Sequence, residues 1–338
     1  MLAPGISGCK PFRSIEAPRE NIDSTERISI YENRRTTPLE IKVETSSEFH
    51  DTVAHNKAVH FYNSRSKKRG RLLIINNYDY KVDSKYRNGA IVDNENLHEL
   101  FKQMGGWEIH HHNNKTAEEM RNIIKNFAED SEGRHFDICC VIIMGHGSEM
   151  SNKTIIYGLD DDYIYANYVQ EQFANDVCRA YRGKPKIFLF QVCRGSSLDH
   201  TIRHTTETDS IFRDTVDTVV MTNAEKLTAN IRTQEDMLIG YATLDGYKAH
   251  RDKYRGSWYI ELICEKFMKY AHNHSVEDLL SLVDQALRTR MSESETMQTA
   301  EHHVKGFKKL YLNPGIYYED GDIKYYNKKR CRIIDILF

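Results

Sequence analysis

The chain of 338 residues is long enough for one large domain or two small ones with a substantial core. Its 47 Lys and Arg residues nearly balance its 49 Asp and Glu residues, so no overall basic field attracts nucleic acid or anionic lipid. No stretch approaches the roughly 18 consecutive apolar residues of a membrane span, and the first residues lack the pattern of a secretion signal. We therefore expect a soluble cytoplasmic protein with neither a nucleic-acid partner nor a membrane partner.

The seven cysteines are odd in number, scattered and without a CxxC pair. This usage favours reduced thiols over a disulfide framework or structural zinc. Three consecutive histidines at 110–112 would point to alternate faces of a strand, so they do not converge on one metal ion. The sequence therefore predicts no metal and no cofactor, and it leaves one cysteine as a candidate thiolate.

Residues 1–69 are rich in charged and polar side chains, which predicts a flexible leader. The apolar run at 72–75 is typical of a strand buried on both faces. Apolar residues at helical spacing then predict a helix over 93–104, and Thr116 with Glu119 forms a capping box that opens a second helix.

Further apolar runs at 138–144 and 187–190 predict two more buried strands, separated by a stretch long enough for a crossover helix around 170–181. Strands that alternate with helices indicate a mainly parallel sheet in an α/β layer fold. Between Gly195 and about Thr233 the apolar density falls, which is typical of a linker.

A second, smaller unit follows this linker. Its pattern predicts a strand at 237–241 and a helix at 257–271. Ser275 with Asp278 caps another helix, and 309–312 suits a last strand before a turn.

Two predicted strands run directly into candidate catalytic groups. In an open α/β sheet, active groups collect at the carboxyl edge of the strands. One strand leads into His146 between two glycines, and another leads into Gln191-Val192-Cys193-Arg194-Gly195. A nucleophilic cysteine needs a base to form the thiolate and a proton donor for the leaving amine. Alone, such a cysteine is more often a small buried hydrophobe, but together the two motifs suggest a pair across adjacent strand ends.

These motifs resemble the signature of the caspase family of aspartate-specific cysteine proteases, in which Q-A-C-[RQG]-G follows a histidine by about 50 residues. Here the separation is 47 residues. Val192 and Gly145 replace the usual Ala and Ser without touching the reacting atoms. The resemblance covers roughly 72–312, and further similar segments are Arg87-Asn88-Gly89 followed by Asp93, and the run from Gly246 through Arg251 to Trp258.

The resemblance implies a caspase-like three-layer α/β sandwich, with a mainly parallel central sheet flanked by helices. It implies that Cys193 attacks the scissile carbonyl and that His146 acts as general acid and base. The backbone N–H groups of Gly147 and Cys193 would form the oxyanion hole, whose donors typically contribute about 3 kcal/mol each.

The resemblance also assigns the aspartate-binding pocket to Arg87, Gln191 and Arg251, because an arginine fork matches a carboxylate. Next to this pocket, His250 stands where most caspases have tryptophan, and Ala249 replaces a usual serine. Trp258 fits the residue that lines a more distant pocket, although its apolar helix face suits a core role nearly as well.

By family resemblance the chain would be cut into a large and a small part that assemble as a homodimer of cleaved pairs. We expect the main cut after Asp209 and a second cut after Asp51 that sheds the leader. The substrates would be proteins with an exposed Asp, and other caspases are possible partners. The predicted organisation is a leader at 1–69, a large part at 70–209, the rest of the linker at 210–233, a small part at 234–315 and a C-terminal extension at 316–338.

Three functions from different classes remain open. The first is an active endopeptidase that cuts after aspartate in apoptosis or a related regulated proteolysis. The second is a weak or inactive homologue that regulates an active caspase by binding, which the changed Ala249 and His250 favour. The third is a metacaspase-like or legumain-like protease that cuts after basic residues, but such a pocket needs acidic groups, whereas Arg87 and Arg251 would repel Lys or Arg.

Overall fold

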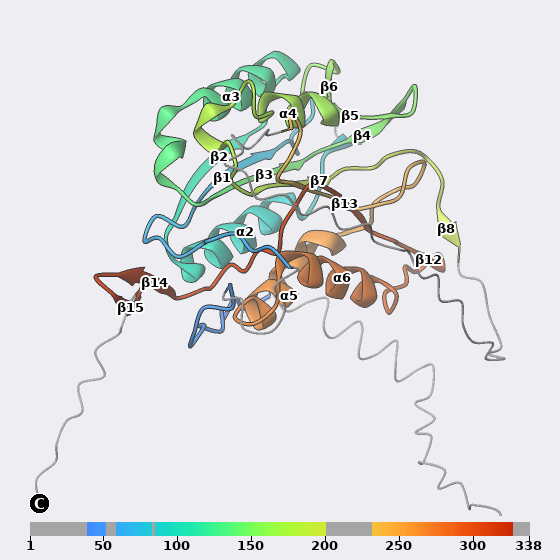
Figure 1. Ribbon diagram of the computed structural model, residues 1–338. Coiled ribbons are helices and arrows are strands. Elements are labelled where there is room, and N and C mark those ends of the chain that lie inside the picture. Colours follow the sequence, from blue (N-terminus) through green and yellow to red (C-terminus); the bar gives the residue numbers. More distant parts are fainter. Residues whose placement is uncertain (1–38, 52–58, 83–84, 201–231, 327–338) are drawn as a thin grey trace, which may run out of the picture. The chain divides into compact units, whose positions relative to one another are not determined.

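The computed structural model describes residues 39–51, 59–82, 85–200 and 232–326. Its centre is a six-stranded sheet in the order β13-β9-β7-β3-β1-β2 (Figure 1). All neighbouring strands are parallel except β13, which pairs antiparallel with β9 at one edge. The strands are β1 (Gly70–Asn76), β2 (Trp107–Asn113), β3 (Ile138–Met144), β7 (Lys186–Gln191), β9 (Met237–Tyr241) and β13 (Glu301–Lys305).

The four inner strands β1, β3, β7 and β9 are buried at every residue. Their continuous apolar runs are the reason that the sequence predicts them, and all four predictions are confirmed. The predicted last strand at 309–312 is wrong, because this segment makes only isolated bridges through Lys309 and Tyr311. Leu310 and Leu312 alternate into the core there, which imitates a strand pattern, while the real edge strand is the polar β13.

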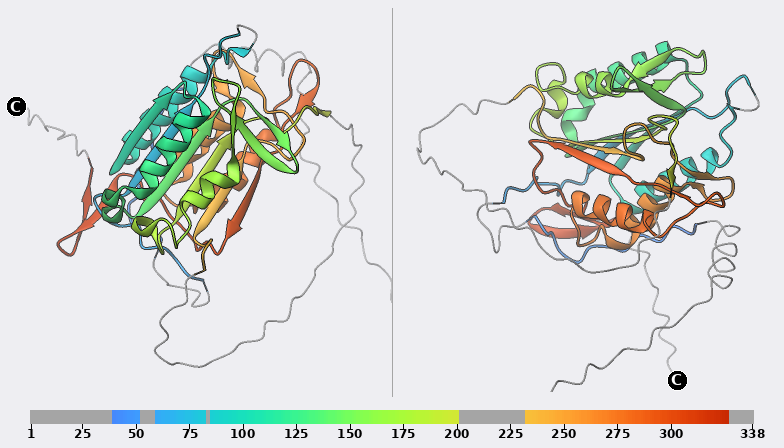
Figure 2. Two further views of the ribbon diagram at one scale, coloured as in Figure 1. Left: turned by 90° about the horizontal axis from the view of Figure 1, so that it is seen from above. Right: turned by 90° about the vertical axis from the view of Figure 1, so that its right-hand side faces the viewer.

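Helices cover both faces of the sheet, so the fold is the predicted three-layer α/β sandwich (Figures 1 and 2). One face packs against α2, α5 and α6, and the other packs against α3 and α4. The predicted capping boxes of Thr116 with Glu119 and of Ser275 with Asp278 are both present. The helices are α2 (Ala90–Met104), α3 (Ala117–Glu129), α4 (Ala166–Gln172), α5 (Trp258–Tyr270) and α6 (Val276–Leu287).

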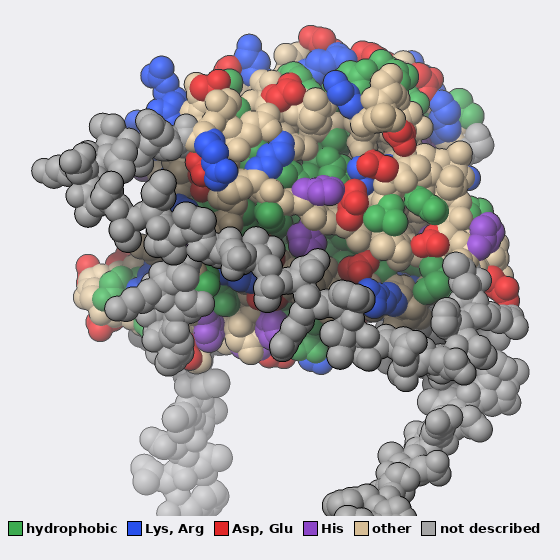
Figure 3. Space-filling view, turned by 45° about the vertical axis from the view of Figure 1, so that its right-hand side comes forward, with side chains coloured by type: hydrophobic (Ala, Val, Ile, Leu, Met, Phe, Trp, Pro, Cys, Tyr) green, Lys and Arg blue, Asp and Glu red, His purple; other side chains and the backbone are tan. Residues whose placement is uncertain are grey.

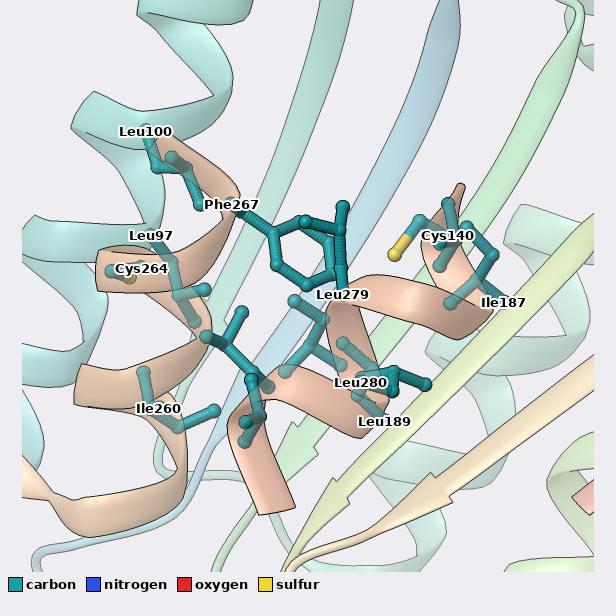
Figure 4. Packing of buried hydrophobic residues seen from close by; sticks show 14 of the residues in the cluster. Leu97, Leu100, Cys140, Ile187, Leu189, Ile260, Cys264, Phe267, Leu279 and Leu280 are labelled. Carbon is teal, nitrogen blue, oxygen red and sulfur yellow. The ribbon is translucent and has the colours of Figure 1, made fainter. Parts of the chain in front are cut away.

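The core between α5, α6 and the sheet joins the predicted large and small parts. Phe267 and Leu279 from these helices meet Leu189 of β7 in one cluster of buried side chains (Figure 4). Full burial of such a side chain contributes about 1.5–3 kcal/mol relative to exposure. The two parts therefore share a single core, which holds the carboxyl ends of the strands in fixed positions.

The crossover between β3 and β7 differs from the expected helix around 170–181. It holds the short α4 and a 3-10 turn, η3 (Arg179–Tyr181). Between them Phe173 and Cys178 turn inward, and the Cys178 thiol donates to the carbonyl oxygen of Ala128 at 3.0 Å. This inward packing ends the helix earlier than the periodicity suggests.

The expectation of a flexible leader throughout 1–69 is wrong for its described part. Ile41, Phe49 and Tyr62 are buried, and Tyr62 donates to Asp236 at 2.7 Å. Composition does not reveal such sparse apolar residues, because charged and polar side chains outnumber them in this segment. The packed unit thus begins well before residue 70.

Short strands surround the central sheet and complete the fold. Within the predicted C-terminal extension, β14 (Ile316–Glu319) and β15 (Asp322–Tyr325) form a hairpin. Acidic and basic side chains are interspersed over the face in Figure 3, in line with the balanced composition. Within the described ranges, every helix is too short or too polar to cross a membrane. The other short strands are β4 (Gly147–Met150), β5 (Lys153–Tyr157), β6 (Tyr163–Tyr165), β8 (Asp199–His200), β10 (Arg251–Asp252), β11 (Gly256–Ser257) and β12 (Thr296–Met297).

Candidate active site

The register of the sheet brings His146 and Cys193 to the same edge. Met144 of β3 pairs with Gln191 of β7, and each candidate catalytic residue lies two positions beyond its strand's member of this pair. The N–H of Gly145 continues the ladder by donating to the carbonyl oxygen of Gln191 at 3.2 Å. The carboxyl edge of the parallel sheet thus presents the imidazole and the thiol next to each other.

The imidazole of His146 is oriented by the loop that follows β1. Its Nε2 lies 2.7 Å from the carbonyl oxygen of Lys85, which only accepts, so Nε2 carries a proton and Nδ1 is the basic nitrogen. The Tyr80 ring is tilted against the imidazole with the ring centroids 4.7 Å apart, and the Tyr80 hydroxyl accepts from the His146 N–H at 3.0 Å. Burial lowers the pKa of His146, the Lys85 carbonyl opposes this, and Arg87 and Arg251 lower the pKa further.

The half-buried thiol of Cys193 lies beside Gly147. A Cβ atom at residue 147 would come within 2.7 Å of the Cys193 carbonyl oxygen, so only glycine fits this close approach. The N–H of Ala249 donates to the Cys193 sulfur at 3.4 Å. Within the described residues, no hydrogen bond joins this sulfur to His146, as is common for catalytic pairs without substrate.

The buried side chains of Arg87 and Gln191 lie next to this pair and have polar atoms that form no hydrogen bond with the described residues. Arg87 is 1% exposed, and its Nη1 donates to Asn76 Oδ1 at 3.0 Å and to the Asn77 carbonyl oxygen at 2.9 Å. Among the described residues, neither its Nε and Nη2 nor Oε1 of the buried Gln191 has a hydrogen-bond partner. An unsatisfied buried polar group costs about 1–3 kcal/mol, so such groups point to a missing ligand.

Arg251 comes from β10 in the small part, and electrostatics connects it to the same site. Burial and, to a smaller extent, the positive charge of Arg251 together lower the pKa of Arg87 to about 10. Although Arg251 is partly open to solvent, desolvation lowers its pKa, while the nearby Asp93 and Cys193 raise it. The two arginines and the thiol therefore form one interacting group.

The flanking residues Ala249, His250 and Trp258 are also brought together. His250 stacks on Trp258 at 4.6 Å, and its Nε2 lies 3.0 Å from the carbonyl oxygen of Met297. Trp258 is 6% exposed and belongs to the hydrophobic core around α5 and α6, so it contributes to the core of the protein. Burial lowers the pKa of His250, while the Met297 carbonyl and the charge of Asp199 oppose this shift.

The sequence does not reveal the roles of Tyr80 and Lys85, which orient His146, or of Asp93, which lies near the two arginines. A carbonyl has no signature in a sequence, and Tyr80 stands in a polar loop without periodicity. Asp93 follows the segment Arg87-Asn88-Gly89 that resembles the family, but a carboxylate in the first turn of a helix suggests only a capping role. Of the predicted cut sites, Asp209 lies outside the described residues, and Asp51 pairs with Arg65. No group of three or more His, Cys, Asp or Glu side chains in the described ranges is arranged to hold a metal ion.

An imidazole and a thiol at neighbouring ends of parallel strands, beside two arginines, define the class of α/β cysteine peptidases. The particular family follows from a family model, described as the caspase domain, that matches residues 69–311. The chain belongs to the caspase family.

Several caspases are similar to this chain. Caspase Dronc of Drosophila melanogaster is 27% identical over 257 residues, which are 74% of this chain and 57% of that protein. Caspase-2 of Gallus gallus is 30% identical over 264 residues, which are 75% of this chain and 61% of that protein. The chain thus spans about three fifths of the length of these two relatives.

Two solved structures are similar in fold. The crystal structure of the Drosophila initiator caspase Dronc has a TM-score of 0.65 at 23% identity and covers 83% of this chain and 97% of its own. The crystal structure of caspase-1 from Spodoptera frugiperda has a TM-score of 0.64 at 24% identity and covers 78% and 97%. These likenesses confirm the caspase fold.

Proposed function

We propose that this chain is an active endopeptidase that cuts proteins after aspartate, with Cys193 as nucleophile and His146 as acid and base. The observation that carries the proposal is the unused hydrogen-bonding capacity of Arg87 beside Cys193. A substrate carboxylate would supply acceptors for Nε and Nη2 of Arg87 and would offset the positive charge of Arg87 and Arg251. A basic substrate residue would add a third positive charge to the same place.

The proposed chemistry gives each of these groups one role. His146 Nδ1 takes the Cys193 proton, and the thiolate attacks the carbonyl carbon while the N–H groups of Gly147 and Cys193 bind the oxyanion. The C–N bond then breaks, and the protonated His146 gives its proton to the leaving amine. The acyl part of the substrate remains bound to the Cys193 sulfur as a thioester. His146 next deprotonates a water molecule that hydrolyses the thioester and restores the thiol.

We assign this activity to apoptosis or a related regulated proteolysis in the cytoplasm. The expected zymogen is cut after Asp209, and the working unit is a homodimer of large and small parts joined through the small parts. Possible partners are other caspases, and the substrates are proteins that expose an aspartate. The caspase domain at residues 69–311 and the similarity to Caspase Dronc and Caspase-2 support this assignment.

A regulatory homologue without activity is the second candidate, and the altered pocket at Ala249 and His250 favours it. A peptidyl-aspartyl fluoromethylketone separates the two functions, because a working thiolate displaces fluoride and forms a stable thioether. We expect one covalent label per chain on Cys193, together with hydrolysis of an aspartyl peptide. A folded chain that shows neither, while a Cys193→Ser control behaves identically, would establish the regulator instead.

A further inference from the structure

A buried carboxylate outside the catalytic pair connects the large and small parts next to the pocket. Asp93 lies in the first turn of α2, and its side chain is 0% exposed. Both of its oxygens accept from one residue of β11, the backbone N–H of Ser257 at 2.8 Å and the hydroxyl of Ser257 at 2.7 Å. A single side chain thus fastens α2 to β11 with two hydrogen bonds.

This connection leads directly to both pocket arginines. Ser257 is the cross-strand partner of Arg251 in the ladder of β10 and β11. Arg87 lies three residues before the first residue of α2, Ala90, and the Arg87 carbonyl oxygen accepts from the N–H of Ala90. Asp93 therefore links the segment that carries one arginine to the strand that carries the other.

The two segments approach so closely that glycine is required on each side. A Cβ atom at Gly256 would lie 2.2 Å from Asp93 Oδ1, and one at Gly89 would lie 2.2 Å from the Asp252 carbonyl oxygen. Both glycines have positive φ, 85° for Gly256 and 81° for Gly89. Glycine at both positions therefore allows the backbone of β11 to approach the carboxylate and the backbone of β10 to approach the start of α2.

Charge gives the carboxylate a second effect. Within the described residues, neither Arg87 nor Arg251 forms an ion pair with a carboxylate, and the positive charge of Arg251 lowers the pKa of Arg87. Asp93 is the largest attractive influence on the pKa of each of them. Burial raises the pKa of Asp93 itself to about 6, against the lowering effects of Ser257 and both arginines, so the carboxylate is ionised at neutral pH.

We propose that Asp93 is a positioning residue of the aspartate pocket, which holds Arg87 and Arg251 at the separation that a substrate carboxylate bridges. It does so by tying β10 and β11 to α2 and by opposing the repulsion between the two guanidinium groups. This inference rests on the proposed cleavage after aspartate. Asp93 itself contacts neither the substrate nor the reacting atoms.

The test is Asp93→Asn in the full chain. Asparagine keeps the shape and both contacts, since its Oδ1 accepts the Ser257 N–H and its amide donates to the Ser257 hydroxyl, but it removes the charge. At pH 7.5 we expect KM for an aspartyl peptide to rise at least tenfold, with kcat within threefold of wild type. A KM within twofold of wild type, or a lower one, overturns the proposal.

The melting temperature and the pH profile distinguish positioning from a structural role. Because folding raises the pKa of Asp93, its ionised form destabilises the folded state above pH 6, and we expect Asp93→Asn to melt at the wild-type temperature or higher at pH 7.5. In the wild type, KM should rise as pH falls through about 6, whereas KM of the variant should stay flat. A lower melting temperature with unchanged KM would mean that Asp93 is only structural.

Glu261→Gln is the matched control, because Glu261 is another buried carboxylate of this region but pairs with Arg255 and Arg290 instead. It should melt at a lower temperature than the wild type and keep KM within twofold.

Binding of a fluorescent peptide that ends in Asp, measured by anisotropy with the Cys193→Ala chain, makes the test independent of turnover. Asp93→Asn should weaken this binding at least tenfold, and equal binding, or no binding by the chain with Asp93 intact, overturns the proposal. Binding without hydrolysis by the wild type would reject the peptidase function alone.

Discussion

Arg65 donates to both carboxylate oxygens of Asp51, from Nε to Oδ2 at 2.8 Å and from Nη2 to Oδ1 at 2.6 Å. The Asp51 side chain is only 2% exposed as a result. The guanidinium also lies over the Phe49 ring at 5.0 Å, so the pair is embedded in the packed part of the expected leader. A protease that cuts after aspartate can bind Asp51 only after the hydrogen bonds between Asp51 and Arg65 have broken.

We therefore predict that Arg65→Ala accelerates cleavage after Asp51, because the substitution exposes the carboxylate and removes its counter-ion. Fragments that begin at Thr52 should appear at least tenfold faster when a Cys193→Ala chain is treated with active enzyme. Lys67→Ala is the control, since its loose contact with Glu319 at 3.8 Å is exposed. Equal rates for the wild type and Arg65→Ala in mass spectrometry would show that this pair does not protect the site.

The catalytic pair gives a second prediction. Cys193→Ser and His146→Ala should each remove turnover by at least about 10³-fold, because nucleophile and acid/base act as a unit. Peptide hydrolysis and circular dichroism should be measured side by side, and the spectra should not change. Activity within tenfold of wild type in folded Cys193→Ser protein would exclude this assignment.

Specificity at the cut residue provides a third prediction. Replacement of Asp by Asn leaves Arg87 and Arg251 without a carboxylate, a loss that reaches roughly 10⁴-fold in kcat/KM at sites built for hydrogen bonding. Glutamate keeps the charge and adds one methylene, at a cost of about 1–3 kcal/mol. The expected order in a peptide library is Asp, then Glu, then Asn, and a library in which Asn or Lys equals Asp would refute the pocket.

The two buried arginines Arg87 and Arg69 give a fourth prediction, about stability. Arg69 is also 1% exposed, but it donates to the carbonyl oxygens of Leu312, Asn313 and Ile316, so Arg69→Met should unfold more easily by about 3 kcal/mol. Arg87→Met removes a poorly satisfied charge and should be as stable as wild type or more so, while it loses cleavage after aspartate. Urea unfolding of both variants checks this contrast, which a loss of stability in Arg87→Met would contradict.

The buried strands and capped helices were predictable from the sequence because each depends on neighbouring residues. The apolar run of β3 and the capping box at Thr116 are local signals of this kind. The edge strand β13 was not predicted because most of its side chains are polar. Its strand conformation depends on hydrogen bonds to β9, which is distant in the sequence. The same holds for the Lys85 carbonyl and for the contact of Asp93 with Ser257, since both connect residues that are distant in the chain. The resemblance supplied the site residues, but their partners came only from the three-dimensional contacts.

The described residues just before and just after residues 201–231 form hydrogen bonds with other parts of the protein. Before this gap, β8 pairs with β12, and Asp199 accepts from the Thr299 hydroxyl at 3.2 Å. After it, Asn175 donates from its side chain to the Arg232 carbonyl oxygen at 2.9 Å and from its N–H to the Thr233 carbonyl oxygen at 2.8 Å. These contacts do not depend on a continuous chain between them.

A cut after Asp209 should therefore give two fragments that stay together. We predict that active protein contains a fragment beginning at Ser210, and that large and small parts co-elute in gel filtration without denaturant, because α5 and α6 share the core with β7.

Asp209→Ala should block this cut, and Asp199→Ala is the control, since Asp199 already lies in a paired strand. Mass spectrometry settles the position, and full activity of Asp209→Ala with no cut anywhere between 196 and 236 would overturn activation by cleavage. Separation of the fragments during gel filtration would instead contradict the shared core.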